Sequence, residues 1–337
     1  MIDILSMMPD EIAEIVAPSY RAEQIFNWLH KQHVATFAAM KNLPLSLRSK
    51  LEETHYISSV TTVKKLESKR DGTVKFLNKT HDGNLIESVL MSYKHGNSVC
   101  ISTQAGCRMG CKFCASAEGG LLRNLTAGEY CAQVYNANGE RPVSNIVLMG
   151  CGEPLDNYES TLKFLKIILY QKGQNFSGRH ITISTCGLVP QIYELAKERL
   201  QLTLAISLHA PDDLTREALM PIAKTYPLKD LIPACRHYAE TTRRRVSFEY
   251  ALAKGINSDA SHAHALAKLL RGINCHVNLI PINKARGGFT PSPRNEIVNF
   301  SKVLEENRIS TTVRRSLGGD VNAACGQLKS NFQQWHL

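Results

Sequence analysis

Three cysteines lie close together with a spacing typical of a metal-binding loop. Cys107, Cys111 and Cys114 form a C-x3-C-x2-C triplet that follows a segment typical of a strand. Thiolates are soft ligands that suit zinc and iron–sulfur clusters, and Gly110 lets the loop curl around such a ligand. Three thiolates leave one iron of a [4Fe–4S] cluster open, and an open iron can bind a substrate. The triplet therefore predicts a catalytic cluster held by these three cysteines.

Structural zinc is an alternative ligand for the same triplet. Such a site takes four ligands, and the sequence has no second C-x2-C or H-x3-H pair to complete it. His209 could contribute from a distant part of the chain. A zinc or iron–sulfur protein that binds RNA without transferring a group is therefore a rival hypothesis.

Composition limits the class of protein. The chain has 337 residues, of which 43% are hydrophobic, enough for one large domain with a small appendage. The ten cysteines are too sparse for a disulfide scaffold. Without a signal-like or membrane-spanning segment, we expect a cytoplasmic protein that does not bind membranes. The formal charge of +10 favours a polyanionic partner such as nucleic acid.

The first hundred residues divide into two patterns. Residues 3 to about 55 have helical periodicity, whereas residues 60 to 93 alternate as strands do. The helical part is equally consistent with a packing module and with one that contacts RNA. The expected helix caps are Asp10 and Ser19, and the expected hairpin turns are Asp71-Gly72 and Asp82-Gly83.

The rest of the chain repeats strand, loop and helix. A capping box from Thr126 to Glu129 begins the helix after the cysteine loop. This alternation predicts an α/β fold whose parallel sheet is doubly wound or curled into a partial barrel, with the chemistry at the strand ends. The expected strands are Val99–Thr103, Asn145–Met149, Ile181–Thr185, Leu202–Leu208, Val246–Leu252, Val277–Ile282 and Thr311–Arg315.

Several motifs together resemble a known family. The triplet with Phe113 before its last cysteine resembles the radical S-adenosylmethionine (SAM) signature, in which the open iron chelates SAM. In their order along the chain, from about residue 85 to 328, the other motifs resemble the RlmN/Cfr family of RNA adenine methyltransferases. They are Gln104-Ala-Gly-Cys107 through Asn124-Leu-Thr, Met149-Gly-Cys-Gly-Glu-Pro154, Ser207-Leu-His-Ala-Pro211, Asn278-Leu-Ile-Pro281 and Ala323-Ala-Cys-Gly-Gln-Leu328.

The resemblance implies a partial (β/α)6-type radical SAM barrel with a small N-terminal helical module and a β-hairpin extension. The corresponding divisions are residues 1–55 for the helical accessory domain and 56–98 for the hairpin extension. Residues 99–337 form the core with its C-terminal catalytic segment. A monomer is expected.

The same resemblance implies three catalytic residues. Cys325 matches the cysteine that SAM methylates and that carries the methyl group to RNA, so two SAM molecules are used per turnover. Cys100 matches the cysteine that resolves the protein–RNA link through a transient Cys100–Cys325 disulfide. Glu87 matches the base that removes the proton from the ring carbon, and its partly apolar strand face would raise its pKa. Taken singly, each is more often a packing or surface residue.

Cofactor contacts follow from the family in the same way. Gly152 permits close approach after a strand, and the Glu153 carboxylate can hold the ammonium group of SAM. The remaining matched positions are Ser184, Ser207, Leu208, His209 and Asn283. Cys131, Cys151, Cys186, Cys235 and Cys275 match no family role and are interpreted as packing residues.

The sequence leaves the methylated position and the RNA substrate open. RlmN-type enzymes methylate adenine C2 in 23S ribosomal RNA at the peptidyl-transferase centre, and some also methylate transfer RNA next to the anticodon; Cfr-type enzymes methylate C8 of that rRNA adenine. Pro154 favours RlmN, whereas the segment from Lys284 to Arg294 departs from its usual loop. A flavodoxin-like electron donor is also implied. Candidate RNA contacts are Lys64, Lys65, Lys69, Arg70, Tyr93, Arg243, Arg244, Arg245, Lys284, Arg286, Phe289, Arg294, Arg314 and Arg315.

A radical SAM enzyme with a different substrate is the other alternative. The segment from Ala323 to Leu328 argues against it, because a methyl-carrying cysteine suits RNA methylation.

Overall fold

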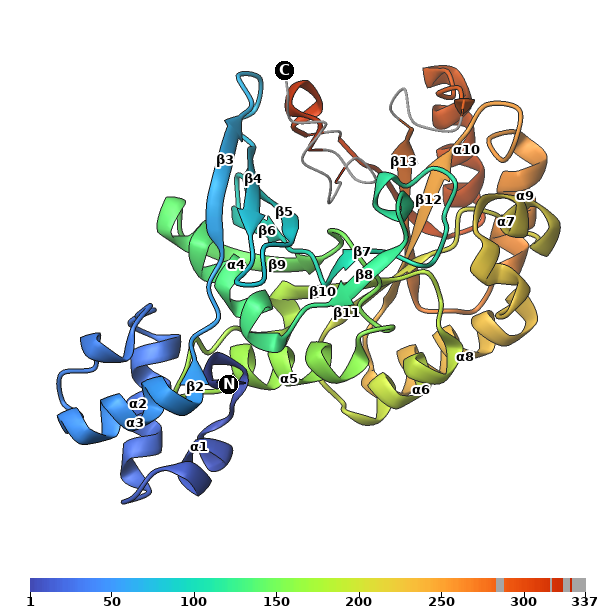
Figure 1. The fold of residues 1–337 in the computed structure, drawn as a ribbon. Helices are drawn as coiled ribbons and strands as arrows, with labels where there is room; N and C mark the ends of the chain where they lie inside the picture. Colours follow the sequence, from blue (N-terminus) through green and yellow to red (C-terminus); the bar gives the residue numbers. More distant parts are fainter. Residues whose placement is uncertain (283–287, 316, 324–327, 329–337) are drawn as a thin grey trace.

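A single mixed sheet forms the centre of the molecule in this computed structural model, which describes residues 1–282, 288–315, 317–323 and 328. Its ten strands run in the order β14-β13-β12-β11-β10-β9-β6-β5-β4-β3, so β14 and β3 are its edges (Figure 1). The strands are β3 (Thr61–Glu67), β4 (Val74–Lys79), β5 (Leu85–Tyr93), β6 (Gly96–Cys100), β9 (Val143–Leu148), β10 (Ile181–Thr185), β11 (Thr203–Ser207), β12 (Val246–Leu252), β13 (Cys275–Pro281) and β14 (Ser310–Val313).

The part of the sheet from β6 to β14 is parallel, and a helix joins each strand to the next. All residues of β12 are buried, as expected for a strand covered on both faces. Six β–α units followed by β14 confirm the α/β fold of partial (β/α)6 type. The helices are α4 (Ala127–Glu140), α5 (Tyr158–Leu169), α6 (Val189–Lys197), α7 (Asp213–Leu219), α8 (Leu228–Thr242), α9 (Ala260–Leu269) and α10 (Arg294–Glu306).

The first parallel strand ends earlier than its sequence indicates. The apolar run predicted a strand to Thr103, but β6 ends at Cys100. Beyond it, the backbone N–H groups of Thr103 and Gln104 both donate to the Cys151 carbonyl, at 2.8 and 3.1 Å. The chain then forms the short strand β7 (Gln104–Gly106), which pairs with β8 (Leu121–Asn124). This change of partner turns the chain out of the large sheet and into the cysteine loop.

Two hairpins continue the sheet on the other side of β6. The turns predicted at Gly72 and Gly83 are confirmed, and both glycines have positive φ, +70° and +88°. Because β5 pairs with β6, this extension belongs to the same sheet as the parallel strands. Residue 98, the last residue of the predicted extension, lies inside β6.

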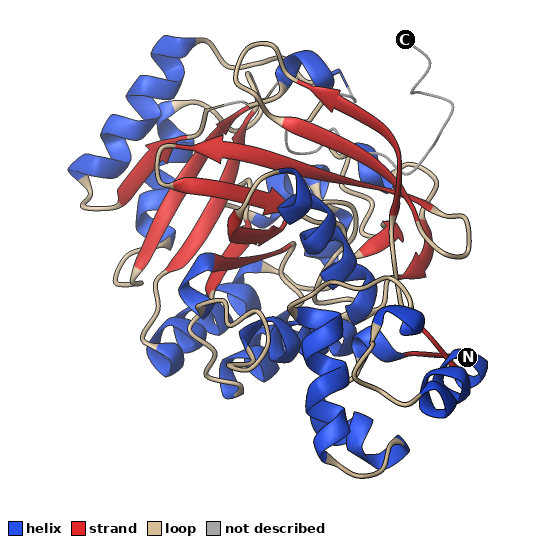
Figure 2. Ribbon diagram, turned by 90° about the vertical axis from the view of Figure 1, so that its left-hand side faces the viewer, coloured by secondary structure: helices blue, strands red, loops and turns tan. Residues whose placement is uncertain are grey.

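The N-terminal helices pack at one end of the molecule (Figures 1 and 2). The buried Asp3 carboxylate accepts from Thr126 at the start of α4, and His30 Nδ1 bonds to the Tyr135 hydroxyl at 2.7 Å. No helix of the described residues is long and apolar enough to cross a membrane. The elements here are β1 (Ile2–Asp3), η1 (Ile4–Ser6), α1 (Pro9–Ile15), α2 (Tyr20–His30), η2 (Phe37–Ala39), α3 (Leu45–Thr54) and β2 (His55–Tyr56).

Two of the three predicted helix N-termini are confirmed, and one is wrong. Ser19 is the N-cap of α2, and the Thr126–Glu129 capping box is present, but Asp10 is not a cap. Pro9 occupies the first position of α1, so Asp10 lies within the first turn and Met8 is the N-cap. Proline is favoured at that position because its missing N–H would have no partner there.

Candidate active site

The cysteine loop is held at its start and within it by backbone hydrogen bonds to other segments. The Cys107 N–H donates to the Gly120 carbonyl at 2.9 Å, and the Lys112 N–H donates to the Leu219 carbonyl at 3.0 Å. Gly106 has a φ of +80°, and a Cβ there would lie 2.0 Å from the Gly120 oxygen. Only glycine therefore lets the two sides of the loop approach this closely. Within it, Cys114 is followed by the 3-10 helix η3 (Ala115–Ala117).

The thiols of the cysteine loop are close enough to influence one another electrostatically. Burial raises the pKa of Cys107 to about 12, and the pKa of Cys111 is raised by burial and by Cys114 and Cys107. No three His, Cys, Asp or Glu side chains in the described part of the chain are already arranged as a metal site. The donor set nevertheless suits an iron–sulfur cluster, because three soft ligands gather on one short, partly buried loop.

His209 does not suit a fourth zinc ligand. Its Nδ1 accepts a hydrogen bond from the Ala251 N–H at 3.0 Å, so the neutral ring carries its proton on Nε2. Burial, followed by the charge of Arg216, lowers the pKa of His209 to about 3, which keeps the ring neutral. The Phe113 ring meets the His209 ring edge-on, with centroids 4.9 Å apart. With neither nitrogen free to ligate, His209 orders the cysteine loop instead.

Glu153 lies beside the cysteines with its carboxylate buried. Its Oε1 accepts from the Leu155 N–H at 3.0 Å and its Oε2 from the Cys186 N–H at 2.8 Å. Burial raises the pKa of Glu153, and its charge in turn raises the pKa of Cys107 and Cys111. A carboxylate oriented by backbone donors can still accept from an ammonium group, since each oxygen has two lone pairs. The position therefore fits the predicted contact with the amino group of SAM.

Gly152 is required by the protein's own backbone. Its φ is +105°, and a Cβ would lie 2.6 Å from Gln104 Cβ and 2.7 Å from Gln104 N. The sequence suggested that this glycine admits a ligand, whereas the structure shows a close approach to the strand before the cysteine loop.

A Gly152→Ala variant is expected to lose about 2–5 kcal/mol of unfolding free energy, because the new Cβ meets backbone at a strained φ. Gly139→Ala is the control. Gly139 lies in α4 with nothing within 4 Å of its added Cβ, so that change should stabilise by up to about 1 kcal/mol. Denaturant unfolding of both variants measures the difference; equal stabilities would contradict this account.

The other predicted cofactor positions lie at the ends of the neighbouring strands. Ser184 is on β10, Ser207 ends β11, and Leu208 and His209 follow it. The N–H groups of Leu208 and His209 donate to the Glu249 carbonyl at 3.1 and 3.3 Å. Leu208 is fully buried. Asn283 lies outside the described residues.

Arg216 is a buried cation that sequence reasoning missed. Its guanidinium is fully buried, and it donates to the carbonyls of Cys186 at 2.7 Å and Tyr226 at 3.1 Å. It lies in α7, the helix whose Leu219 holds the cysteine loop. Arg216 thus joins the end of β10 to the support of that loop. An arginine in a polar helix carries no sequence signal for such a role.

Glu87 forms a buried ion pair. It lies on β5 and is 1% exposed, and its Oε1 is 2.9 Å from the Nζ of Lys75 on β4. The alternation that placed Glu87 on a partly apolar face missed this ammonium. The charge of Lys75 stabilises the carboxylate form and so opposes the effect of burial. Glu87 is therefore built to hold a negative charge away from water.

Cys100 faces the same side of the sheet. In the register of the strands, Lys75 pairs with Val89, Val89 with Cys100, and Cys100 with Val147. Glu87 is two residues from Val89, so its side chain points to the same face. Cys100 is buried and packs in one cluster with Val89, Ala323 and Leu328.

The C-terminal segment crosses to the β3–β4 hairpin. Asp71 Oδ2 accepts from the Gly318 N–H at 2.9 Å, and Asp320 accepts from the Ser68 hydroxyl at 2.7 Å. In Figure 1 the short helix η7 (Gly319–Val321) lies beside this hairpin. Further along, the Ser116 hydroxyl donates to the Leu328 carbonyl at 2.9 Å.

Cys325 itself lies outside the described residues, which include neighbours on both sides of it. Asn322 and Ala323 precede it on the hairpin side, and Leu328 follows it beside Ser116, two residues after Cys114. We name residues 317–323 with Leu328 the carrier segment. Its Asn322 carbonyl accepts from the Lys75 ammonium at 3.0 Å, and its Leu328 carbonyl accepts from the Ser116 hydroxyl, so both anchors join residues far apart in sequence.

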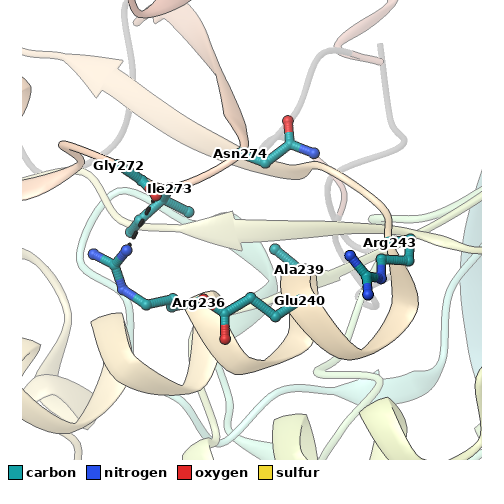
Figure 3. Close-up of a pocket in the computed structure, with 7 residues that line it drawn as sticks. All are labelled: Arg236, Ala239, Glu240, Arg243, Gly272, Ile273 and Asn274. Atoms are coloured by element: carbon teal, nitrogen blue, oxygen red, sulfur yellow. Dashed lines mark hydrogen bonds between the residues drawn. The ribbon is translucent and has the colours of Figure 1, made fainter.

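The basic residues predicted to meet RNA do not form one surface. Lys64, Lys65, Lys69 and Arg70 lie on the β3–β4 hairpin near the carrier segment. Arg243 to Arg245 precede β12, at the N-terminal end of that strand. A cavity of about 260 Å³ lies there, between the end of α8 and the residues before β13, and Arg236 donates to the Gly272 carbonyl at 3.1 Å beside it (Figure 3). Lys284 and Arg286 lie outside the described residues.

The five cysteines interpreted as packing residues are buried or nearly so. Cys131, Cys151, Cys186 and Cys235 are buried, and Cys275 is partly exposed.

Comparisons with known proteins agree with this arrangement. The radical SAM superfamily model matches residues 101–266, and the model of the ribosomal RNA large subunit methyltransferase N-terminal domain matches residues 5–57. A crystal structure of a radical SAM methyltransferase from Sphaerobacter thermophilus has a TM-score of 0.92 and 44% identity, covering 98% of this chain and 100% of that one.

Two curated relatives carry the name probable dual-specificity RNA methyltransferase RlmN. The one from Clostridium novyi (strain NT) is 50% identical over 98% of this chain and 99% of its own. The one from Clostridium botulinum (strain Eklund 17B / Type B) is 53% identical over 93% of this chain and 91% of its own. A [4Fe–4S] cluster and SAM follow from the superfamily. Identity of this extent, over nearly the whole of both chains, shows that the chain belongs to the RlmN family of radical SAM methyltransferases.

Proposed function

We propose that this chain methylates C2 of an adenine in 23S ribosomal RNA at the peptidyl-transferase centre, by way of a methyl group carried on Cys325. The observation that carries the proposal is the carrier segment, anchored before Cys325 next to Glu87 and after it next to the cysteine loop. A carrier cysteine must be methylated at the cluster and must also meet the base and the resolving thiol. Anchors at both places suit that requirement.

The residues divide the work as follows. When bound, the cluster and two SAM molecules per turnover supply the methyl group and the 5′-deoxyadenosyl radical that removes a hydrogen atom from it. Cys325 then forms a carbon–carbon bond to C2 through its methylene carbon, and the radical adduct would return one electron to the cluster, which would have spent one on the reductive cleavage of SAM. Glu87 accepts the C2 proton. Cys100 attacks the Cys325 sulfur, the S–C bond breaks, and the methylene carbon takes up a proton to become the methyl group. Cellular reductants reopen the disulfide.

Glu153 is the proposed partner of the SAM ammonium group, and the residues at the ends of β10 and β11 are its proposed further contacts. Burial favours this arrangement because an ion pair is stronger away from water. His209 is neutral and can donate from Nε2.

The curated relatives are named dual-specificity RNA methyltransferases, and this supports transfer RNA, at the adenine next to the anticodon, as a second substrate. The net charge of +10 favours binding to either polyanion. We propose a cytoplasmic monomer with a flavodoxin-like electron donor, on the family resemblance.

Mass spectrometry of RNA tests the proposal. Ribosomal and transfer RNA from a host without C2 methylation would be incubated with anaerobically reconstituted enzyme, SAM and reductant. Methyl at C2 of the rRNA adenine supports the proposal, and methyl at C8 would replace it with the Cfr-type reaction. Cleavage of SAM to 5′-deoxyadenosine without methyl on either RNA would overturn the substrate assignment and leave the radical SAM core intact.

A further inference from the structure

Lys75 is a buried lysine at a position where the sequence indicates only an ordinary strand residue. It is 5% exposed, and lysine is almost never this buried without a partner. Its Nζ is 2.9 Å from Glu87 Oε1 and 3.0 Å from the Asn322 carbonyl oxygen. One ammonium group therefore contacts both the proposed base and the backbone three residues before Cys325.

The Lys75 ammonium can make its contacts with Glu87 and Asn322 at the same time. The sheet register places Lys75 opposite Val89, on the face that also carries Glu87 and Cys100. An ammonium has three donors and can serve a carboxylate and a carbonyl together. Because the site is buried, losing the carboxylate would remove the opposite charge next to the ammonium, and losing the carbonyl would remove one of its hydrogen-bond acceptors.

We infer that Lys75 is the positioning residue that aligns the carrier segment with the base of the resolving step. It pairs with the Glu87 carboxylate and, through the Asn322 carbonyl, sets how close Asn322 lies to that carboxylate. Lys75 takes no part in bond making or breaking. The inference rests on the proposed function, since it assigns Glu87 as the base and Cys325 as the methyl carrier.

The first test follows the protein–RNA adduct. A Lys75→Met variant is expected to accumulate the Cys325-linked adduct and to resolve it at least about tenfold more slowly, while SAM cleavage stays within about twofold. Lys75→Arg keeps the charge and the donors and should recover part of the resolving rate. Lys79→Met, an exposed lysine on the same strand, is the matched control and should behave as the wild type.

The second test needs neither cluster nor SAM. Amide hydrogen exchange of residues 318–323 is expected to be at least about fivefold faster in Lys75→Met than in Lys79→Met, since an anchor of that segment is gone. Loss of the ion-pair partner can itself impair folding, so a Lys75→Met/Glu87→Gln variant is compared with Glu87→Gln alone. Neither of these two variants has the Glu87 carboxylate, so faster exchange in the double variant reports the loss of the contact between Lys75 and Asn322.

The outcomes separate the two proposals. Wild-type resolution and exchange in Lys75→Met would overturn the role of Lys75 and leave the methyl-carrier mechanism standing. If the wild-type enzyme itself forms no methyl-Cys325, as read from its intact mass, the proposed function fails. Faster exchange in Lys75→Met with an unchanged resolving rate would also overturn the inference, because it would reduce Lys75 to a structural anchor.

Discussion

Replacing Cys325 by alanine is expected to reduce methyl transfer to RNA at least about a thousandfold, while the reconstituted enzyme still binds its cluster and cleaves SAM. The reason is that an adenine ring carbon is a poor nucleophile for direct transfer from SAM, so the methyl group needs a covalent carrier. The loop of Cys107, Cys111 and Cys114 is anchored by its own backbone bonds to Gly120 and Leu219, which the substitution does not touch.

Two measurements distinguish loss of the methyl carrier from general misfolding of the variant. The intact mass of the variant should lack the single added methyl group of the wild type, and 5′-deoxyadenosine should still form. Cys275→Ala is the control, because Cys275 begins β13 and has no assigned role. Methylated RNA produced by Cys325→Ala at more than a few per cent of the wild-type rate would eliminate the carrier mechanism.

A Glu87→Gln variant is expected to stop at the protein–RNA adduct, with the resolving step slowed about 10²–10⁴-fold, the usual contribution of a general base. The amide keeps the size of the side chain and its contact with Lys75 but cannot take the C2 proton. Formation of the carbon–carbon bond precedes that step, so the adduct should accumulate. Denaturing gel electrophoresis of enzyme incubated with RNA would show it as a species of reduced mobility.

The controls for Glu87→Gln are a measurement of its unfolding free energy and a second variant, Glu67→Gln. The change removes the carboxylate charge beside the buried Lys75 ammonium, so the unfolding free energy should fall by up to about 3–5 kcal/mol. The adduct is a product that appears, and a partly unfolded protein would not generate it. Glu67→Gln removes an exposed carboxylate from β3, two strands away in the same sheet, and should turn over normally. Free methylated RNA without adduct in Glu87→Gln would remove Glu87 from the mechanism.

Much of the architecture was predictable from local patterns. The turns at Gly72 and Gly83 and the capping box of α4 depend on residues within a few positions of one another, so the sequence contains their full determinants. Boundaries were less predictable. β6 ends three residues before the predicted Thr103 because the Ser102 N–H donates to the Gln133 side chain and those of Thr103 and Gln104 donate to the Cys151 carbonyl, nearly fifty residues away.

The sequence by itself determined which chemistry to expect of this protein: it has three soft ligands on one loop and an ordered set of motifs that resembles one family. Single residue types and short spacings are enough for that. Only the tertiary structure decided which groups meet. Glu87 was predicted on a partly apolar face and lies against Lys75, while Gly152 accommodates the backbone of Gln104. Strand register and the path of the C-terminal segment create these contacts, and both depend on pairings between distant residues that local sequence does not encode.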